Sequence, residues 1–219
     1  SICLYPMFAT NRRLERKPSV LTAIQHKFLI AHTNDFTAHE KEAVFLEGTG
    51  SMVLDREKKI AYACLSPRTH QKVLDEFCET MQYKGVSFIA VDAAGAPIYH
   101  TNVMMCVADD YVVICLDSIK DQNEQHLVKQ SIIDSGKIII EIDFNQMNRF
   151  AGNMLQVHNS KGQKFLVMSS QAYHALTPKQ IETIHSFNQI IHSDITTIET
   201  NGGGSARCMM AEIFLKKEK

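Results

Sequence analysis

The sequence predicts an α/β protein in which a unit of strand, strand, helix and strand is repeated. Short runs of β-branched and aromatic residues alternate with segments of helical spacing, and this order recurs three times along the chain. One chemically distinctive residue also recurs at a nearly constant interval. A chain of 219 residues can bury a substantial core as one domain or as two small ones. We expect a single domain over residues 1–219.

The first complete unit spans residues 43–92. The segments "AVFLEGTGSMVLD" and "KIAYACLS" predict two strands joined by a polar turn. Residues 69–82 then have apolar side chains at helical spacing, and Thr69 is suited to cap the start of that helix. The segment "VSFIAVD" predicts the closing strand of the unit.

Two further units follow in the same order. The second consists of predicted strands at 97–107 and 111–119, a helix at 121–136 and a strand at 137–143. The third consists of predicted strands at 150–159 and 164–170, a helix at 177–191 that starts with Pro178, and a strand at 195–200. Outside the units we expect a strand at 1–7, a helix around 12–27, a strand at 28–32 and a lone last strand at 206–215.

The recurring distinctive residues are assigned to the first strand of each unit and to the lone last strand. They are Glu47, His100, Asn153 and Cys208, separated by 53, 53 and 55 residues. Equivalent positions of a repeat occupy equivalent places in each unit. If the units circle an axis, the four side chains converge on one central site, whereas an open solenoid would place them in a row.

Composition excludes several function classes. The net charge of −1, with basic residues scattered, argues against a nucleic-acid surface or an anionic-membrane patch. No apolar run approaches the roughly 18 residues that a membrane helix needs. The six cysteines contain no C-x-x-C pair, which argues against a zinc site. Cys64, Cys106 and Cys115 lie in apolar runs, so we expect buried free thiols and a reducing, cytoplasmic location.

A cysteine, a histidine and a carboxylate in one pocket are the parts of a thiol nucleophile with its proton carrier and its orienting group. Cys208 would attack as a thiolate, His100 would move protons and Glu47 would hold the imidazole. Backbone N–H groups of the preceding "GGGSAR" loop would stabilise negative charge. Each residue also has a purely structural reading: a packed thiol, an ordinary histidine, a carboxylate bonded to a turn, and a glycine linker.

The motifs "FLEGTGSMVLDR", "LSPRT", "YHTNVMM", "FAGNML" and "GGGSARCMMAE", in this order, resemble the amidinotransferase and arginine deiminase superfamily, the penteins. The nearest match resembles the citrulline-utilisation hydrolase branch. The resemblance implies a five-bladed α/β propeller of ββαβ units around a central active site. Because the family continues upstream, it also implies that part of an N-terminal blade is absent from this chain. An incomplete ring would leave strand edges exposed, which favours association of copies.

The resemblance assigns roles to individual residues. Cys208 matches the nucleophile, His100 the catalytic histidine and Glu47 its orienting carboxylate. Arg68 of "SPRT" matches an arginine that holds the substrate α-carboxylate in the deiminases, although a surface arginine at a strand end is the alternative. Ser205 and Arg207 of the glycine-led loop are further candidates for substrate contact, whereas we treat Asn153 and Asp55 as structural or supporting residues.

One departure from the deiminase pattern bears on the substrate. Those enzymes carry an aspartate two residues after the catalytic histidine, where it pairs with the guanidinium of arginine, and this chain has Asn102. A neutral amide suits a neutral ureido group better than a buried cation. We therefore expect a small-molecule substrate, citrulline or a close relative, hydrolysed to ornithine, ammonia and carbon dioxide without metal or organic cofactor. The alternatives are an arginine deiminase or amidinotransferase of the same fold, and a non-catalytic propeller that binds a partner.

Overall fold

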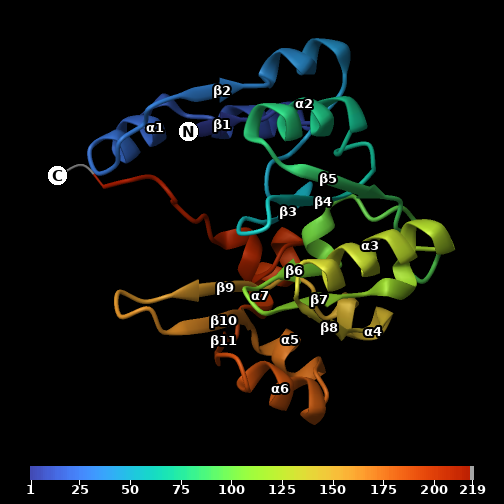
Figure 1. Ribbon diagram of the computed structural model, residues 1–219. Helices are drawn as coiled ribbons and strands as arrows, with labels where there is room; N and C mark the ends of the chain where they lie inside the picture. Colours follow the sequence, from blue (N-terminus) through green and yellow to red (C-terminus); the bar gives the residue numbers. More distant parts are fainter. Residues whose placement is uncertain (218–219) are drawn as a thin grey trace.

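The computed structural model describes residues 1–217 and contains three sheets of three strands each, together with one sheet of two strands (Figure 1). In every three-stranded sheet the first two strands pair antiparallel and the third joins the middle strand in parallel. The parallel connection is made through a helix, as such a crossover requires. The predicted repeat of strand, strand, helix and strand is therefore confirmed three times.

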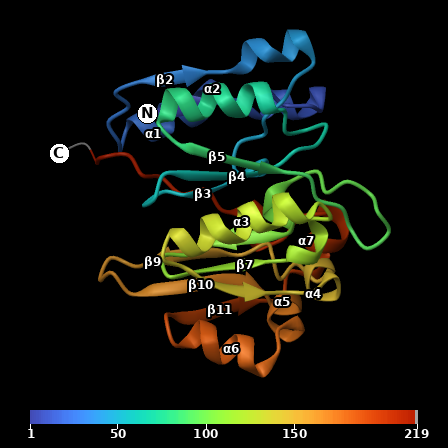
Figure 2. The same cartoon turned by 45° about the vertical axis from the view of Figure 1, so that its right-hand side comes forward.

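The three units follow one another through the molecule in chain order (Figures 1 and 2). The first comprises β3 (Met52–Asp55), β4 (Ile60–Cys64), α2 (Gln71–Met81) and β5 (Lys84–Phe88). The second comprises β6 (Met105–Val107), β7 (Tyr111–Ile114), α3 (Gln122–Asp134) and β8 (Ile138–Glu141). The third comprises β9 (Leu155–His158), β10 (Lys164–Ser169), α5 (Ser170–Ala175), α6 (Pro178–His185) and β11 (Gln189–Ser193).

The remaining segments surround these units. β1 (Ile2–Leu4) pairs in parallel with β2 (Thr33–Asp35), and α1 (Pro18–Gln25) lies between them in sequence. Two further helices, α4 (Phe144–Asn148) and α7 (Thr196–Gly202), follow the second and third units. Single 3-10 turns are η1 (Thr10–Glu15), η2 (Thr37–Glu42), η3 (Thr101–Val103), η4 (Leu116–Ser118) and η5 (Ala206–Met209). None of the helices within residues 1–217 is both long and apolar enough to cross a membrane.

Predicted elements toward the C-terminus differ from the structure in extent or in type. The predicted helix 177–191 ends at His185, and its last residues belong to β11, which pairs in parallel with β10. The predicted strand 195–200 is the helix α7, because the Asp194 carboxylate accepts hydrogen bonds from the Thr196 N–H and hydroxyl and so starts a helical turn. The predicted lone strand 206–215 is η5 followed by extended chain with no ladder partner, so it has no neighbour with which to form a sheet.

Helix starts follow the predicted chemistry in part. Pro178 occupies the first turn of α6, as predicted, and Thr177 forms a capping box with Gln180. The N-cap of α2 is His70 rather than Thr69, because the Thr69 backbone is paired with Ser66 in a β-bridge and cannot enter the helix start.

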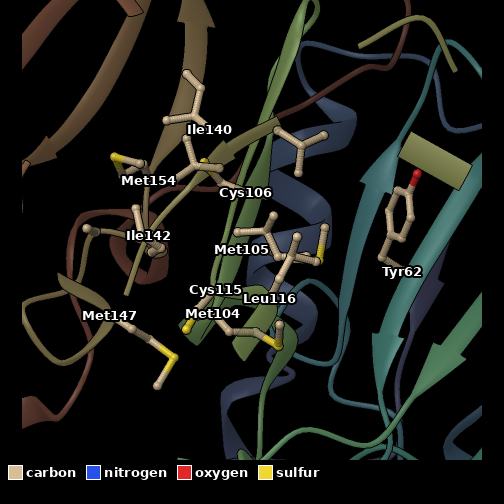
Figure 3. Close-up of a cluster of buried hydrophobic side chains, with 14 of the residues drawn as sticks. Tyr62, Met104, Met105, Cys106, Cys115, Leu116, Ile140, Ile142, Met147 and Met154 are labelled. Carbon is tan, nitrogen blue, oxygen red and sulfur yellow. The ribbon is translucent and has the colours of Figure 1, made fainter. Parts of the chain in front are cut away.

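The middle strand of each sheet is the most buried, and the alternation of side chains along β4 assigns them to two core clusters. In β4 the side chains of Tyr62 and Cys64 face a cluster that continues through all three units, whereas Ala61 and Ala63 face a smaller cluster under α2. Figure 3 shows part of the large cluster, in which methionines and Ile140 surround Cys106 and Cys115. The predicted burial of Cys64, Cys106 and Cys115 is confirmed, and burial raises the pKa of Cys106 to about 12.

A buried ion pair joins the first and second units. The Nζ of Lys137 lies 3.4 Å from Oδ2 of Asp55 and donates to the carbonyl oxygen of Asp109 at 2.5 Å. Asp55 ends β3 and Lys137 precedes β8, and both side chains are almost fully buried. Removing one partner of such a pair leaves an uncompensated charge in the interior.

We therefore predict that Lys137→Met lowers the free energy of unfolding by about 3 kcal/mol, measured by urea denaturation. Lys179→Met is the matched control, because Lys179 is exposed on α6 and the same change of side chain removes no buried charge. An equal effect of the two substitutions would contradict a stabilising role for the pair.

Candidate active site

The four recurring residues lie in turns rather than in strands, which corrects the sequence-based placement. Glu47 lies in the turn before β3, His100 is the N-cap of η3, Asn153 lies in the turn before β9, and Cys208 lies in η5. The strands themselves start later than predicted because Gly48, with φ of +58°, takes the chain out of extended geometry and η3 occupies residues 101–103.

Glu47 and His100 are joined by a short contact between their side chains. Nε2 of His100 lies 2.7 Å from Oε2 of Glu47, and the other carboxylate oxygen accepts the N–H of Phe8 at 2.9 Å. The Glu47 side chain is only 4% exposed. Burial by itself would raise the pKa of Glu47, but the hydrogen bonds from His100 and Phe8, with the charges of His100 and Arg68, hold that pKa below its usual value. Glu47 is thus kept as a carboxylate that orients the imidazole.

The turn that carries Glu47 is bonded directly to η3. The carbonyl oxygen of Gly50 accepts the N–H of Asn102, and the Thr101 hydroxyl donates to the carbonyl oxygen of Ser51 at 2.5 Å. A side chain at position 50 would place its Cβ 2.9 Å from Cε1 of the His100 ring, so only glycine leaves room for this ring. The first and second units therefore meet at the histidine.

Cys208 is exposed and lies against two asparagine side chains. Its sulfur is 3.3 Å from Nδ2 of Asn153 and 3.8 Å from Nδ2 of Asn102. No hydrogen bond in residues 1–217 joins this sulfur to the His100 ring. Asn102 follows His100 by two residues in η3, so this asparagine links the turn that carries the histidine to the cysteine sulfur.

Hydrogen bonds of Ser205 and Arg207 hold the loop before Cys208 in place. The Ser205 hydroxyl is fully buried and donates to Oε1 of Glu199 in α7 at 2.6 Å. The Arg207 N–H donates to the carbonyl oxygen of Asn153, and its guanidinium donates to the carbonyl oxygen of Met210. The hydroxyl of Ser205 and this guanidinium bond therefore fix the shape of the loop.

Arg68 lies at the mouth of the site with a partly exposed guanidinium. Nη1 is 3.7 Å from Oε2 of Glu47, and the side chain is 36% exposed. The rings of Tyr99 and Phe8 flank it, at 4.8 Å and 5.8 Å from the guanidinium carbon. A partly exposed planar cation beside two rings can bind a carboxylate.

Asn102 carries an unused acceptor. Its Oδ1 is buried and has no hydrogen-bond partner within residues 1–217, while the side chain as a whole is 5% exposed. The same residue lines a cavity of about 270 Å³, together with Thr49, Met105 and Arg207. A buried acceptor without a donor costs free energy unless a ligand or water supplies one. Among residues 1–217 no group of three His, Cys, Asp or Glu side chains could hold a metal ion.

The sequence did not predict several residues that shape the site. The backbone of Phe8 could not be predicted to reach Glu47, because 39 residues separate them and a backbone donor has no sequence signal. Glu199 was assigned to a strand, so its bond to Ser205 was not expected. The glycine at position 50 had a signal, since "EGTGS" surrounds the carboxylate with residues that allow close approach.

We predict that Gly50→Ala lowers kcat by about 100-fold, because the new Cβ displaces the His100 ring and misplaced catalytic groups cost rates of that order. Turnover measured at saturating substrate tests this. Gly85→Ala in β5 is the matched control, since a Cβ there meets only the sulfur of Cys78, at 3.3 Å, and no group of the site. Similar rates for the two variants would contradict the tight fit around the imidazole.

Comparison with known proteins places the chain in a family. The family model for eukaryotic N,N-dimethylarginine dimethylhydrolases matches residues 1–215. A comparison with curated protein sequences gives no match.

Solved structures share the fold. ArgZ, an arginine dihydrolase from the ornithine-ammonia cycle in Cyanobacteria, has a TM-score of 0.71 at 17% identity over 94% of this chain. Unliganded AgrE has a TM-score of 0.75 at 16% identity over 99% of this chain. A dimethylarginine dimethylaminohydrolase in adduct with S-methyl-L-thiocitrulline has a TM-score of 0.58 at 14% identity over 94% of this chain, and the match covers 69% of that protein. The chain spans 28% of the length of ArgZ and 29% of that of AgrE.

At such identities these likenesses concern the fold, a mixed α/β arrangement of several small sheets that matches the pentein type. The closed ring of five blades is not present in residues 1–217. The predicted superfamily is confirmed, whereas the citrulline-utilisation branch stays a prediction. The neighbours ArgZ and dimethylarginine dimethylaminohydrolase are hydrolases that act on C–N bonds. Since the family match covers nearly the whole chain, the protein belongs to the dimethylarginine dimethylhydrolase family of the pentein superfamily.

Proposed function

We propose that this chain carries the catalytic groups of a cysteine-dependent hydrolase that cleaves C–N bonds in a ureido or guanidino amino acid, with citrulline or a close relative as substrate. The observation that supports the proposal is that the turn which carries His100 contacts both the Glu47 carboxylate and, through Asn102, the Cys208 sulfur. Oε2 of Glu47 lies 2.7 Å from Nε2 of His100. Nδ2 of Asn102, two residues after His100, lies 3.8 Å from the Cys208 sulfur. A non-catalytic binding protein would have no use for this set.

In the proposed reaction the Cys208 thiolate attacks the central carbon of the ureido group. Protonated His100 donates its proton to the departing nitrogen, and ammonia leaves while a covalent S-linked intermediate remains. Neutral His100 then takes a proton from water, which attacks the intermediate and releases the thiolate. The carbamate product loses carbon dioxide and leaves ornithine. Glu47 keeps the imidazole oriented and stabilises its charged form during both steps.

The case for a neutral substrate group rests on Asn102. Its buried Oδ1 lacks a donor within the described chain, and a ureido NH₂ can supply one. An amide brings no negative charge, so a cationic guanidinium buried beside it would be left without the partner that a carboxylate provides. Each oxygen of Glu47 already has one partner, His100 or the Phe8 N–H, and Arg68 lies near Oε2 as well.

We assign the α-carboxylate of the substrate to Arg68, whose guanidinium is partly exposed at the mouth of the site. A second candidate class is the guanidino amino acids. ArgZ is described as an arginine dihydrolase, and AgrE has been solved with L-arginine. The choice between the two classes depends on whether the substrate group beside Asn102 is a neutral ureido group or a cationic guanidinium.

We further propose that the units belong to a five-bladed ring, as the superfamily resemblance implies. Three ββαβ units in chain order and a fourth segment that delivers Cys208 to the same centre support this arrangement. All six cysteines are free, which favours a reducing compartment such as the cytoplasm.

Cys208→Ala is expected to abolish turnover of citrulline while the thermal unfolding transition stays unchanged, because the side chain is exposed and supports no core packing. Production of ornithine and ammonia measures the activity. Cys78→Ala is a control for the loss of a thiol outside the site. Turnover by Cys208→Ala at the rate of the unsubstituted protein would refute the nucleophile.

Asn102→Asp is expected to exchange the preferred substrate. A carboxylate in place of the amide favours the arginine guanidinium, so kcat/KM for arginine relative to citrulline should rise at least tenfold. Both substrates are assayed on both proteins. A greater preference for arginine already present in the unsubstituted protein would overturn the choice of citrulline and leave the guanidino alternative.

A further inference from the structure

We infer that Asn153 is a positioning residue for the nucleophile: its side-chain amide donates a hydrogen bond that holds the Cys208 sulfur as a thiolate, aimed at the site. The inference rests on the proposed role of Cys208. It assigns a specific task to a residue that sequence analysis treated as structural.

The orientation of this amide is fixed by a neighbouring group. Nδ2 of Asn153 lies 2.9 Å from the carbonyl oxygen of Asn102, which can only accept a hydrogen bond. The nitrogen, and not Oδ1, must therefore face Asn102. An NH₂ group has two hydrogens, and the second is left for the Cys208 sulfur at 3.3 Å.

The turn that carries Asn153 is held rigidly against η3. Asn153 is 2% exposed, and its N–H donates to the carbonyl oxygen of Phe150, a non-glycine residue with φ of +64°. A Cβ at Gly152 would lie 2.5 Å from the carbonyl oxygen of Val103, so the turn packs backbone against backbone. The carbonyl oxygen of Asn153 accepts the N–H of Arg207. One residue thus touches both the histidine-bearing turn and the cysteine-bearing turn.

The Asn153 amide interacts differently with the thiol and the thiolate forms of Cys208. A thiol can donate to Oδ1 of Asn153, which lies 3.6 Å from the sulfur, but a thiolate can only accept. The Nδ2 donor at 3.3 Å is closer than the Asn102 donor at 3.8 Å and serves the charged form. The other charged groups around the site are Arg207, Arg68 beside the Glu47–His100 pair, and Glu199 behind the loop that carries Cys208.

The pH dependence of Cys208 alkylation tests this directly, without turnover. The full chain is treated with iodoacetamide over a range of pH, and the modified Cys208 peptide is quantified by mass spectrometry. We expect Asn153→Ala to raise the pH of half-maximal rate by about one unit, which corresponds to a tenfold loss of thiolate near neutral pH. Asn153→Asp keeps the shape but replaces the donor by an acceptor, so the midpoint should rise at least as far.

Asn188→Ala is the matched control. Asn188 is also a buried asparagine, and its side chain forms hydrogen bonds with Tyr111 and Gln156. It lies between α6 and β11 rather than at the Cys208 sulfur. Its alkylation profile should equal that of the unsubstituted protein, even where its unfolding temperature falls. Profiles are taken only on variants with a cooperative unfolding transition, and Asn153→Ser provides a third, smaller replacement.

An unchanged alkylation midpoint in the folded Asn153 variants would overturn the inference, even if their turnover were reduced, because a merely structural role lowers rates without moving this midpoint. A shifted midpoint in a protein that hydrolyses neither citrulline nor arginine would uphold the inference and refute the proposed function instead.

Discussion

The hydrogen bond between Glu47 and His100 is the interaction on which the rest of the site depends. It joins the turn before β3, in the first complete unit, to the turn before β6, in the second. The carboxylate is buried, so it has to be satisfied from within the protein, and His100 and the Phe8 N–H together do this. The depressed pKa of Glu47 expresses that balance, since its hydrogen bonds outweigh the cost of burial.

The repeated fold determines where the turn before each first strand lies, but not which polar side chain that turn carries. In each unit the polypeptide makes a turn before the first strand, and each turn directs one polar group to the same centre. The middle strands β4, β7 and β10 contribute to the apolar core, whereas the polar groups lie in the turns before the first strands. A carboxylate, an imidazole and an amide therefore occupy corresponding turns of the three units.

The sequence predicted the order of elements well because three hydrophobic strand patterns and three amphipathic helices were repeated with regular spacing. Element ends were less predictable. Residues 195–200 are rich in β-branched side chains, yet the carboxylate of Asp194 starts a helix there, and a local side-chain bond outweighs propensity. The grouping of Cys208 with His100 followed from the spacing of repeats. The amide contacts at the sulfur did not, because they depend on the directions of side chains in turns.

Two glycines determine how closely these turns approach one another. Gly50 lies against the imidazole of His100, and Gly152 lies against the backbone of η3. Both therefore press on the same 3-10 turn, one from the side of the carboxylate and one from the side of the thiol. A Cβ at either position would separate groups that must lie within hydrogen-bond distance, although neither glycine carries a functional group. The absence of a side chain at these two glycines therefore helps to set the geometry of the site. The turn η3 and its N-cap His100 contact the Glu47 carboxylate on one side and, through Asn102, the Cys208 sulfur on the other.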